Sequence, residues 1–373
     1  MNNMSNLETY FAELIQCAGT VYLTISVLLA LMKTEKSTIY RPYRIAKWML
    51  TGAFASMALN LFLWCLFTNK NWEEFNYYIG MTDIVLFYLE YMLVCNGFCV
   101  LLNKEYVQGK RIKIDLICWA VTSLIAISSL SASMQQYRPY IISLALIMLT
   151  TYIACFTVRF YKLYNHYKQQ LANYFSDDMH RFARWIARSV VLCVISWLVA
   201  IMSMFGNVYF NWLYQFYVIS LNIYIAVSFI NFHKRYADLA KADTEYAYIG
   251  ENEKKEEEVN TQQKNTLAKR IDVWLDTRSY LSEQFTLEDL AASIGTNKNY
   301  LSFYINERYG MNFSSWISKM RIDEAKRLMT SCPEWKMEEI AYSVGFSSAS
   351  YFSKVFSFHE SMSPTRWKKE NIA

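Results

Sequence analysis

Hydrogen-bonding and basic side chains gather in two short segments near the C-terminal end of the sequence. Each segment begins with a glycine and a polar turn: "GTNKNYLSFY" starts at residue 295 and "GFSSASYFSK" at residue 345. Amide, hydroxyl and ammonium groups placed on one helix face are able to contact the edges of DNA bases. The side chains expected to face outward are Lys298, Asn299, Ser302 and Phe303 in the first segment and Ser348, Ala349, Ser350, Ser353 and Lys354 in the second, with Arg366 further along.

The elements that position these side chains are repeated. "LEDLAASIG" at 287–295 matches "MEEIAYSVG" at 337–345, and after one inserted residue the match resumes at Tyr300 and Tyr351. The sequence of each copy predicts a short helix, then a tight turn at Gly295 or Gly345, then a second helix. Glycine is expected there because the turn requires a positive φ. This is the helix-turn-helix plan, in which the second helix lies in the DNA major groove.

The apolar residues of each copy predict how its two helices pack. They recur on one face of each helix, and an alanine lets the helices approach closely. The expected inward residues are Leu290, Ala291, Ile294, Tyr300, Leu301 and Ile305 in the first copy and Ile340, Ala341, Val344, Tyr351, Phe352 and Phe356 in the second. Thr286 with Asp289 predicts a helix start, as does the Ser363–Pro364 pair.

Four stretches of the tail carry a family resemblance. They are "TLEDLAASIGTNKNYLS", "RIDEAKRLM", "EEIAYSVGFSSASYFSKVF" and the "SP" at 363–364. Residues 264 to about 370 resemble the DNA-binding domain of the AraC/XylS family of bacterial transcription regulators. The resemblance implies two helix-turn-helix units bridged by a long helix, reading adjacent major-groove segments on one face of double-stranded DNA.

The net charge of this tail is low for a DNA-binding domain. Residues 264–373 contain 15 Lys and Arg against 13 Asp and Glu. Because DNA affinity depends on neutralising phosphates, the positive charge must be placed locally. The expected phosphate-facing residues are Lys298, Lys319, Arg321, Lys354, Arg366 and Lys368.

The preceding residues have the composition of a membrane domain. Residues 14–32, 48–69, 116–137 and 139–158 carry no charge, and each is long enough to cross a bilayer as a helix. Two further spans are expected from the uncharged run 189–232, broken at "FGN" (205–207), and a seventh covers 77–102. The expected fold is therefore all-α, a seven-helix transmembrane bundle followed by a double helix-turn-helix domain.

The charges between the spans predict their orientation. Alternate loops hold 15 Lys and Arg, whereas the opposite loops hold only Lys70 and Arg138. By the positive-inside rule the N-terminus is outside and the C-terminal domain is cytoplasmic. This pattern is typical of a multi-pass protein of the bacterial inner (cytoplasmic) membrane. The opening residues "MNNMSNLETYF" have no basic region, so no cleaved signal peptide is expected.

Two acids interrupt the third span. Asp83 and Glu90 are seven residues apart and so share one helix face. Charges at this depth are costly, so the face is expected to point into the bundle, with Asn60, Asn96, Gln215 or Asn222 as polar partners. Two interpretations stay open: a sensing site for a ligand or proton, and a structural hydrogen-bond network.

The chemistry of an enzyme is not indicated. None of the four His residues lies at a useful spacing from a Cys or carboxylate, and no nucleotide-binding, zinc-protease or nucleophile-elbow motif occurs. The eight Cys residues indicate neither a metal nor a disulfide framework, and no cofactor is expected. The predicted domains are 1–232 in the membrane, a juxtamembrane linker at 233–263, and the DNA-binding domain at 264–373.

Two functional hypotheses remain. The first is a membrane-tethered one-component transcription regulator, bound to the lipid bilayer and to DNA, working as a homodimer and responding to an unidentified signal or ligand. The second is a transporter or other small-molecule membrane protein whose tail has a regulatory role. Proteolytic release of the tail is compatible with the first. The repeated helix-turn-helix favours the first, since the spans show no inverted repeat or broken helix.

Overall fold

The computed structural model of the chain describes residues 6–67, 72–108, 110–176, 179–203, 208–252 and 261–372. Regular structure in these ranges is helical throughout, and the β-type pairing found there is an isolated antiparallel bridge between Phe175 and Thr286. The all-α prediction is thereby confirmed. The chain divides into two compact units, one comprising residues 1–165 and 183–237 and the other residues 166–182 and 238–373.

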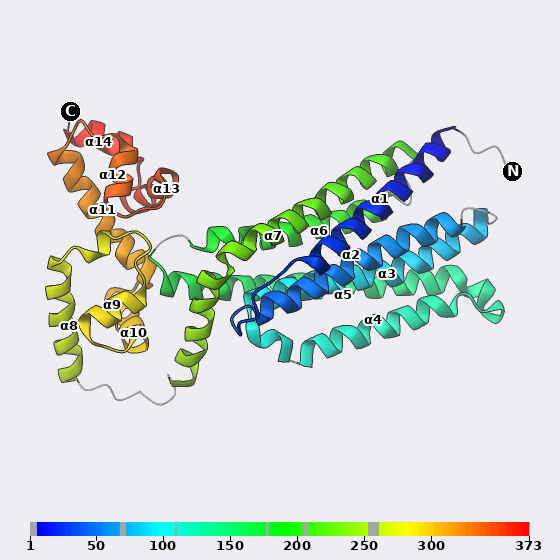
Figure 1. The fold of residues 1–373 in the computed structure, drawn as a ribbon, viewed down its shortest axis with the longest axis horizontal. Coiled ribbons are helices and arrows are strands. Elements are labelled where there is room, and N and C mark those ends of the chain that lie inside the picture. Colours follow the sequence, from blue (N-terminus) through cyan, green and yellow to red (C-terminus); the bar gives the residue numbers. More distant parts are fainter. Residues whose placement is uncertain are drawn as a thin grey trace. The chain divides into compact units, whose positions relative to one another are not determined.

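Seven long helices build the first unit (Figure 1). The last turns of α5 and the C-terminal part of α7 continue into the second unit. The expected break at 205–207 lies outside the described residues, between α6 and α7. The helices are α1 (Asn6–Leu31), α2 (Arg41–Phe67), α3 (Trp72–Leu102), α4 (Lys110–Ser128), α5 (Arg138–Tyr174), α6 (Arg184–Ser203) and α7 (Val208–Asn252), with 3-10 turns η1 (Lys104–Gln108), η2 (Ala132–Tyr137) and η3 (Met179–Phe182).

Six of these helices are long and apolar enough to cross a membrane, and α4 is the exception. The predicted bounds of the fourth span were wrong: α4 begins at Lys110 rather than 116 and ends at Ser128 rather than 137. Its first two turns therefore carry Lys110, Arg111, Lys113 and Asp115. The charge-free run was misleading because its last nine residues, "SLSASMQQY", form turns and the 3-10 helix η2 instead of continuing α4.

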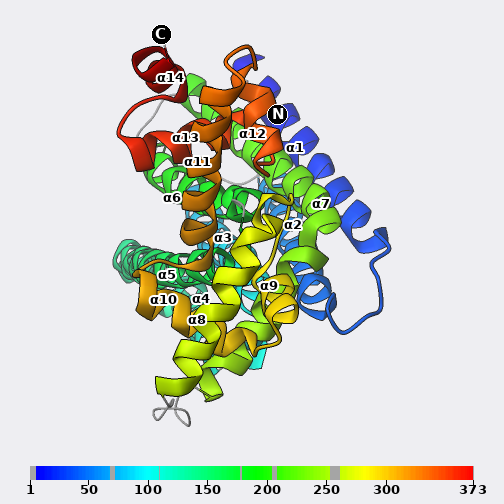
Figure 2. The ribbon, with the colours of Figure 1, turned by 90° about the vertical axis from the view of Figure 1, so that its left-hand side faces the viewer.

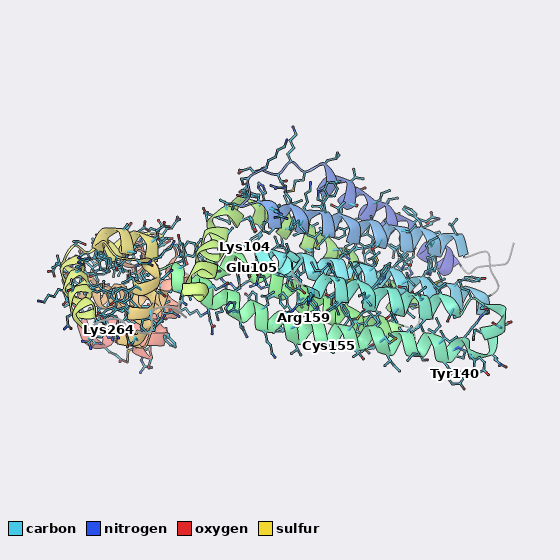
Figure 3. All side chains as sticks on the ribbon, turned by 90° about the horizontal axis from the view of Figure 1, so that it is seen from below. Lys104, Glu105, Tyr140, Cys155, Arg159 and Lys264 are labelled. Carbon is cyan, nitrogen blue, oxygen red and sulfur yellow. The ribbon has the colours of Figure 1, made fainter. Side chains whose placement is uncertain are left out.

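The surface of the first unit is unusually apolar. Among the described residues, 32 of the 36 exposed large apolar side chains belong to it. Tyr140, near the start of α5, is 74% exposed and points outward (Figure 3). Even α4 exposes an apolar stripe at Ile114, Ile117, Val121 and Leu124. Surfaces of this kind are suited to a non-aqueous solvent.

Hydrogen bonds and an ion pair connect helices within this unit. Ser26 Oγ donates to the carbonyl of Thr51 at 2.9 Å, and the hydroxyl of Tyr43 donates to the carbonyl of Phe229 at 2.8 Å. Between α4 and α5, Arg159 pairs with the buried Asp115 at 3.1 Å. These contacts satisfy polar groups that would otherwise be costly to bury.

The second unit contains two three-helix groups joined by one long helix. Figure 2 shows α11 (Phe313–Ser331) running from the group α8 (Thr261–Asp276), α9 (Leu287–Ile294) and α10 (Lys298–Tyr309) to the group α12 (Met337–Ser343), α13 (Ala349–Glu360) and α14 (Pro364–Ile372). Each group has its own apolar core. The first is centred on Leu290, Leu301 and Ile305, and the second on Ile340, Phe352 and Phe356.

Candidate nucleic-acid interface

The first helix-turn-helix is formed by α9 and α10. Thr286 and Asp289 make a reciprocal capping box at the start of α9, with the Thr286 amide donating to Asp289 Oδ2 at 2.8 Å. Gly295 ends this helix at φ 63°, and the side chain of Asn297 caps α10. The predicted turn, its glycine and the Thr286–Asp289 capping pair are confirmed, whereas the Asn297 cap was not expected from sequence.

The second helix-turn-helix is formed by α12 and α13, and its turn is more constrained. Gly345 has φ 85°, and a Cβ added there would collide with the carbonyl group of Leu281. Both the backbone conformation and the close approach therefore require glycine. Ser348 Oγ accepts a hydrogen bond from the Tyr351 amide at 3.3 Å, so Ser348 caps α13.

Most of the predicted contact residues lie on accessible parts of α10 and α13 or beside them. Phe303, Ser350, Lys354 and Arg366 are exposed, whereas Lys298, Asn299, Ser348, Ala349 and Ser353 are partly buried. Ser302 is a correction, because only 7% of it is exposed. It lies next to Leu301 and three residues before Ile305, both fully buried, and so falls at the edge of the inward face.

Arg321 is a second correction, because the guanidinium expected to face phosphate is entirely buried. Its Nε donates to the carbonyl of Tyr280 at 2.7 Å and its Nη2 to the carbonyl of Ser282 at 2.7 Å. Nη2 also reaches Ser176 Oγ at 3.3 Å. Arg321 therefore holds the loop before α9 against α11.

The other residues expected to contact phosphate differ in whether their side chains already make contacts within the protein. Lys368 donates to the carbonyl of Trp335 at 2.9 Å, and Arg366 pairs with Glu370 at 2.7 Å. Lys319 and Lys354 are exposed on α11 and α13. Of this set, Lys319 and Lys354 are thus the two whose ammonium groups are most accessible to a phosphate or a base.

One prominent side chain of this surface was missed by the sequence reasoning. Phe358 is 81% exposed on α13, and it follows Ser350 and Lys354 at steps of four residues, so the three share one face. By the repeat, the equivalent positions of α10 are Asn299, Phe303 and Glu307. The step of four residues was the signal that would have found Phe358.

A segment far away in sequence also belongs to this unit. The amide of Ser176 donates to the carbonyl of Phe285 at 3.1 Å, and the hydroxyl of Tyr174 donates to Glu288 Oε2 at 2.8 Å. Together with the bridge between Phe175 and Thr286, these bonds attach the end of α5 to the start of α9. No local pattern in the sequence indicates this contact.

The α11 helix carries a charged cluster beside Arg321. The carboxylate of Glu324 accepts from Arg327 Nη2 at 2.6 Å and from Arg278 Nη1 at 3.3 Å. The hydrogen bond from Arg327 is the main reason that the pKa of Glu324 lies below its usual value, and the positive charge of Arg278 acts in the same direction.

Asp83 and Glu90, the two acids expected from sequence on one face of α3, have different surroundings. The carboxylate of Asp83 accepts a hydrogen bond from Asn60 Nδ2 at 2.8 Å, one of the partners expected from sequence. Glu90 instead lines a cavity together with Asn222, whose amide donates to the carbonyl of Val218 at 3.1 Å. Within the described ranges, no three His, Cys, Asp or Glu side chains are grouped as metal ligands.

The geometry shows two helix-turn-helix units, α9 with α10 and α12 with α13, joined by α11. A family model described as "Helix-turn-helix domain" matches residues 290–370, and this part of the chain is an AraC-type domain. No solved structure matches the chain.

Curated relatives match over the same region. Regulatory protein PocR of Salmonella typhimurium is 29% identical over 25% of this chain and 30% of its own length. An uncharacterized HTH-type transcriptional regulator, YisR of Bacillus subtilis, is 33% identical over 25% of this chain and 32% of its own length. HTH-type transcriptional activator RhaR of Klebsiella pneumoniae is 31% identical over 25% of this chain and 33% of its own length. The chain thus spans about a third of each relative, and the match supports a DNA-binding regulator.

Proposed function

We propose that this chain is a membrane-tethered one-component transcription regulator of a bacterial inner membrane. The observation that carries the proposal is the contrast between its units: one exposes apolar side chains along seven helices, and the other contains an AraC-type domain. In this proposal residues 1–232 lie in the bilayer, 233–263 form the juxtamembrane segment, and 264–373 bind specific double-stranded DNA. The apolar stripe of α4 supports counting it as the seventh span.

The route from signal to DNA runs through helices shared by the two units. α5 is unbroken from Arg138 to Tyr174, and the hydrogen bonds of Tyr174 and Ser176 attach its end to α9. α7 is likewise continuous from Val208 to Asn252. In this proposal, a change in either helix within the bilayer is passed along that helix toward the residues of the second unit.

Topology is tested with reporter fusions. Fusions after Thr68 and Tyr137 should report the outside, and fusions after Lys104 and Phe160 the cytoplasm, as the loop charges predict. A cytoplasmic signal from the Tyr137 fusion would contradict the seven-span arrangement.

DNA binding is tested by genome-wide occupancy of the tagged protein, with and without the membrane unit. Discrete sites occupied by the full chain support the proposal, and their absence from both forms would refute it. The proposed contact residues are Lys298, Asn299, Phe303, Ser348, Ala349, Ser350, Ser353, Lys354 and Arg366, of which Lys354 and Ser350 are the most accessible on α13.

We also propose that the protein works as a homodimer, because the low net charge of the DNA-binding domain limits the affinity of a single copy. Two tethered copies would raise the effective concentration of the second domain to about the millimolar range, which strengthens binding without a new protein–DNA contact. Crosslinking in native membranes, beside a reporter driven by an occupied site, tests this. Full activation by a protein that stays monomeric would contradict it.

The face of α3 that carries Asp83 and Glu90 is the proposed sensing region. The bond from Asn60 supports a positioning role for Asp83 between α2 and α3, whereas Glu90 is free to meet a ligand in the cavity. Replacing the pair with Asn and Gln should change the response of the reporter while leaving DNA binding by the tail intact. A double variant that responds like the wild type would remove this face from the mechanism.

A further inference from the structure

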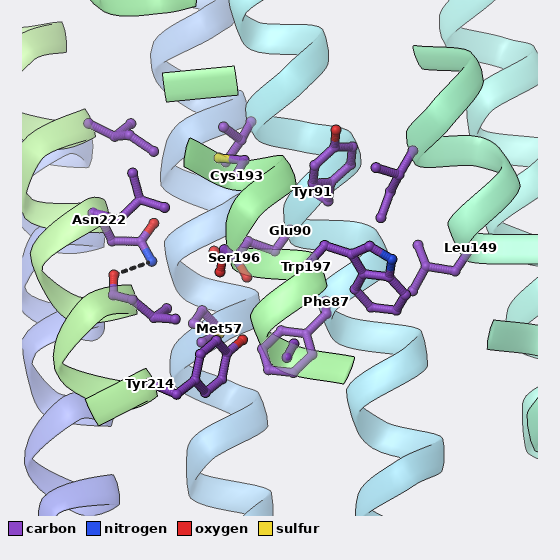
Figure 4. Close-up of a pocket in the computed structure, with 16 residues that line it drawn as sticks. Met57, Phe87, Glu90, Tyr91, Leu149, Cys193, Ser196, Trp197, Tyr214 and Asn222 are labelled. Atoms are coloured by element: carbon purple, nitrogen blue, oxygen red, sulfur yellow. Dashed lines mark hydrogen bonds between the residues drawn. The ribbon is translucent and has the colours of Figure 1, made fainter. Parts of the chain in front are cut away.

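The membrane unit contains a cavity between five of its helices. Its volume is about 80 Å³, several times the roughly 10–15 Å³ that one water requires. The lining side chains come from α2, α3, α5, α6 and α7 and are mostly apolar (Figure 4). Four are aromatic: Phe87, Tyr91, Trp197 and Tyr214. The space therefore suits a small molecule with an apolar body.

Glu90 is the one carboxylic acid among the described residues that line this cavity, and Lys, Arg and His are absent from that lining. Its carboxylate forms no hydrogen bond or ion pair with the described part of the chain. Tyr214 and Cys193 lie close enough to interact with it electrostatically. A carboxylate this deep in a bilayer is costly unless a partner compensates its charge.

We infer that this cavity binds a small organic cation, an alkylammonium, through Glu90. The ammonium would pair with the carboxylate, the aromatic faces would attract the positive charge, and the apolar lining would receive the alkyl chain. A divalent metal fits poorly, because hard cations require about six oxygen ligands and a single carboxylate lines the site. An anionic ligand would meet the charge of Glu90 with no basic group to offset it.

This inference rests on the proposed function, in which the membrane unit receives the signal. The lining includes Leu149 and Ile153 of α5 and Tyr214 and Asn222 of α7, the two helices that continue beyond this unit. A cation that draws Glu90 of α3 toward these helices would favour one arrangement of the bundle over another.

The test uses the full chain in lipid nanodiscs and three probes of similar size: n-butylammonium, n-butanol and propionate. Equilibrium dialysis, corrected with empty nanodiscs, gives the binding of each probe. We expect saturable binding of n-butylammonium only. Glu90→Gln should weaken it by about 30-fold or more, the scale on which truncating one partner of a buried charged pair acts. Glu105→Gln, the same change at an exposed residue of η1, is the matched control (Figure 3).

Saturable binding of n-butanol or propionate as tight as that of n-butylammonium would overturn the inference, as would n-butylammonium binding that survives Glu90→Gln. If Glu90→Gln does not fold, the order of the three probes on the wild-type chain still decides. DNA occupancy is measured separately. A chain that binds its DNA sites but not n-butylammonium refutes this inference alone, whereas a chain that binds n-butylammonium but no DNA refutes the proposed function.

Discussion

A hydrogen bond of 3.3 Å joins Arg321 Nη2 on α11 to Ser176 Oγ, two residues beyond the end of α5. They are 145 positions apart in sequence. The same guanidinium holds the carbonyls of Tyr280 and Ser282. One buried side chain thus connects the bridging helix, the loop before α9 and the segment that follows α5.

Replacing Arg321 should therefore destabilise the DNA-binding unit. Arg321→Leu leaves two carbonyls without a donor and should cost about 3 kcal/mol or more. Arg321→Lys should also destabilise, since one ammonium does not reproduce the planar fork. Denaturant unfolding of the purified chain measures both. Lys319→Ala, at an exposed position two residues earlier, should change stability by less than about 0.5 kcal/mol. Wild-type stability in Arg321→Leu would show that this network is unimportant.

The helix ends of the two repeats differ in a way that can be exploited. Gly310 ends α10 at φ 64°, and Ser361 ends α13 at the equivalent position with φ 57°. Because side chains are strained in this region, Ser361→Gly should stabilise the chain by about 1 kcal/mol.

Two further glycine substitutions provide the comparison. Gly310→Ala should cost about 1 kcal/mol from backbone strain alone, since among the described residues only the chain neighbours of Gly310 lie within 4 Å of an added Cβ. Gly345→Ala should cost clearly more, because the Leu281 carbonyl blocks the methyl group. Thermal unfolding of the three variants gives the order, and equal losses for Gly310→Ala and Gly345→Ala would contradict the close approach at Gly345.

Lys354 is expected to matter for DNA. If the ammonium contacts a base, Lys354→Ala should weaken DNA binding by about 1–3 kcal/mol and relax the sequence preference at the contacted base pair. If it contacts a phosphate, affinity should fall for all sequences and the salt slope should decrease by about 1. Titration of an occupied site at several salt concentrations separates the two outcomes. Lys269→Ala, exposed on α8, is the control. An unchanged affinity and an unchanged slope together would remove Lys354 from the interface.

The Glu324 cluster predicts a dependence of stability on pH. A carboxyl whose pKa is lowered by folding stabilises the native state above its unfolded pKa, near 4.5, and this contribution is lost as the pH falls through the folded pKa. Glu324→Gln should thus lower the melting temperature by a few degrees at pH 7, and the difference from wild type should shrink below about pH 4.5. Asp276→Asn, at an exposed position on α8, controls for the loss of a carboxylate. A difference in melting temperature between Glu324→Gln and wild type that does not change with pH would contradict this role of the Glu324 carboxylate.

Local chemistry made much of the DNA-binding unit predictable. The turn glycines, the Thr286 cap and the inward residues follow from backbone sterics and helix periodicity, which act over a few neighbouring residues. Ser302 and Arg321 were misplaced because their environments depend on other elements. Ser302 lies at the edge of a helix face, where periodicity does not separate buried from exposed, and Arg321 is buried by acceptors about 40 positions away.

The first unit shows a similar limit. Charge-free runs predicted the presence of its helices, but not that α4 would begin among charged residues and stop at Ser128. Its basic and acidic residues fit because Asp115 pairs with Arg159 of α5. The attachment of Tyr174 and Ser176 to α9 was equally invisible, since it joins residues more than 100 positions apart.

The unlike faces of α10 and α13 give the domain a direction. In the proposed DNA complex, α10 presents Asn299, Phe303 and Glu307 and α13 presents Ser350, Lys354 and Phe358. Reversing the protein on its site would therefore exchange unlike side chains. An operator bound in this way would be asymmetric, so its two ends would differ. Inverting it in front of a promoter would keep the sequence bound, yet it would turn the opposite flank of the protein toward the start of transcription.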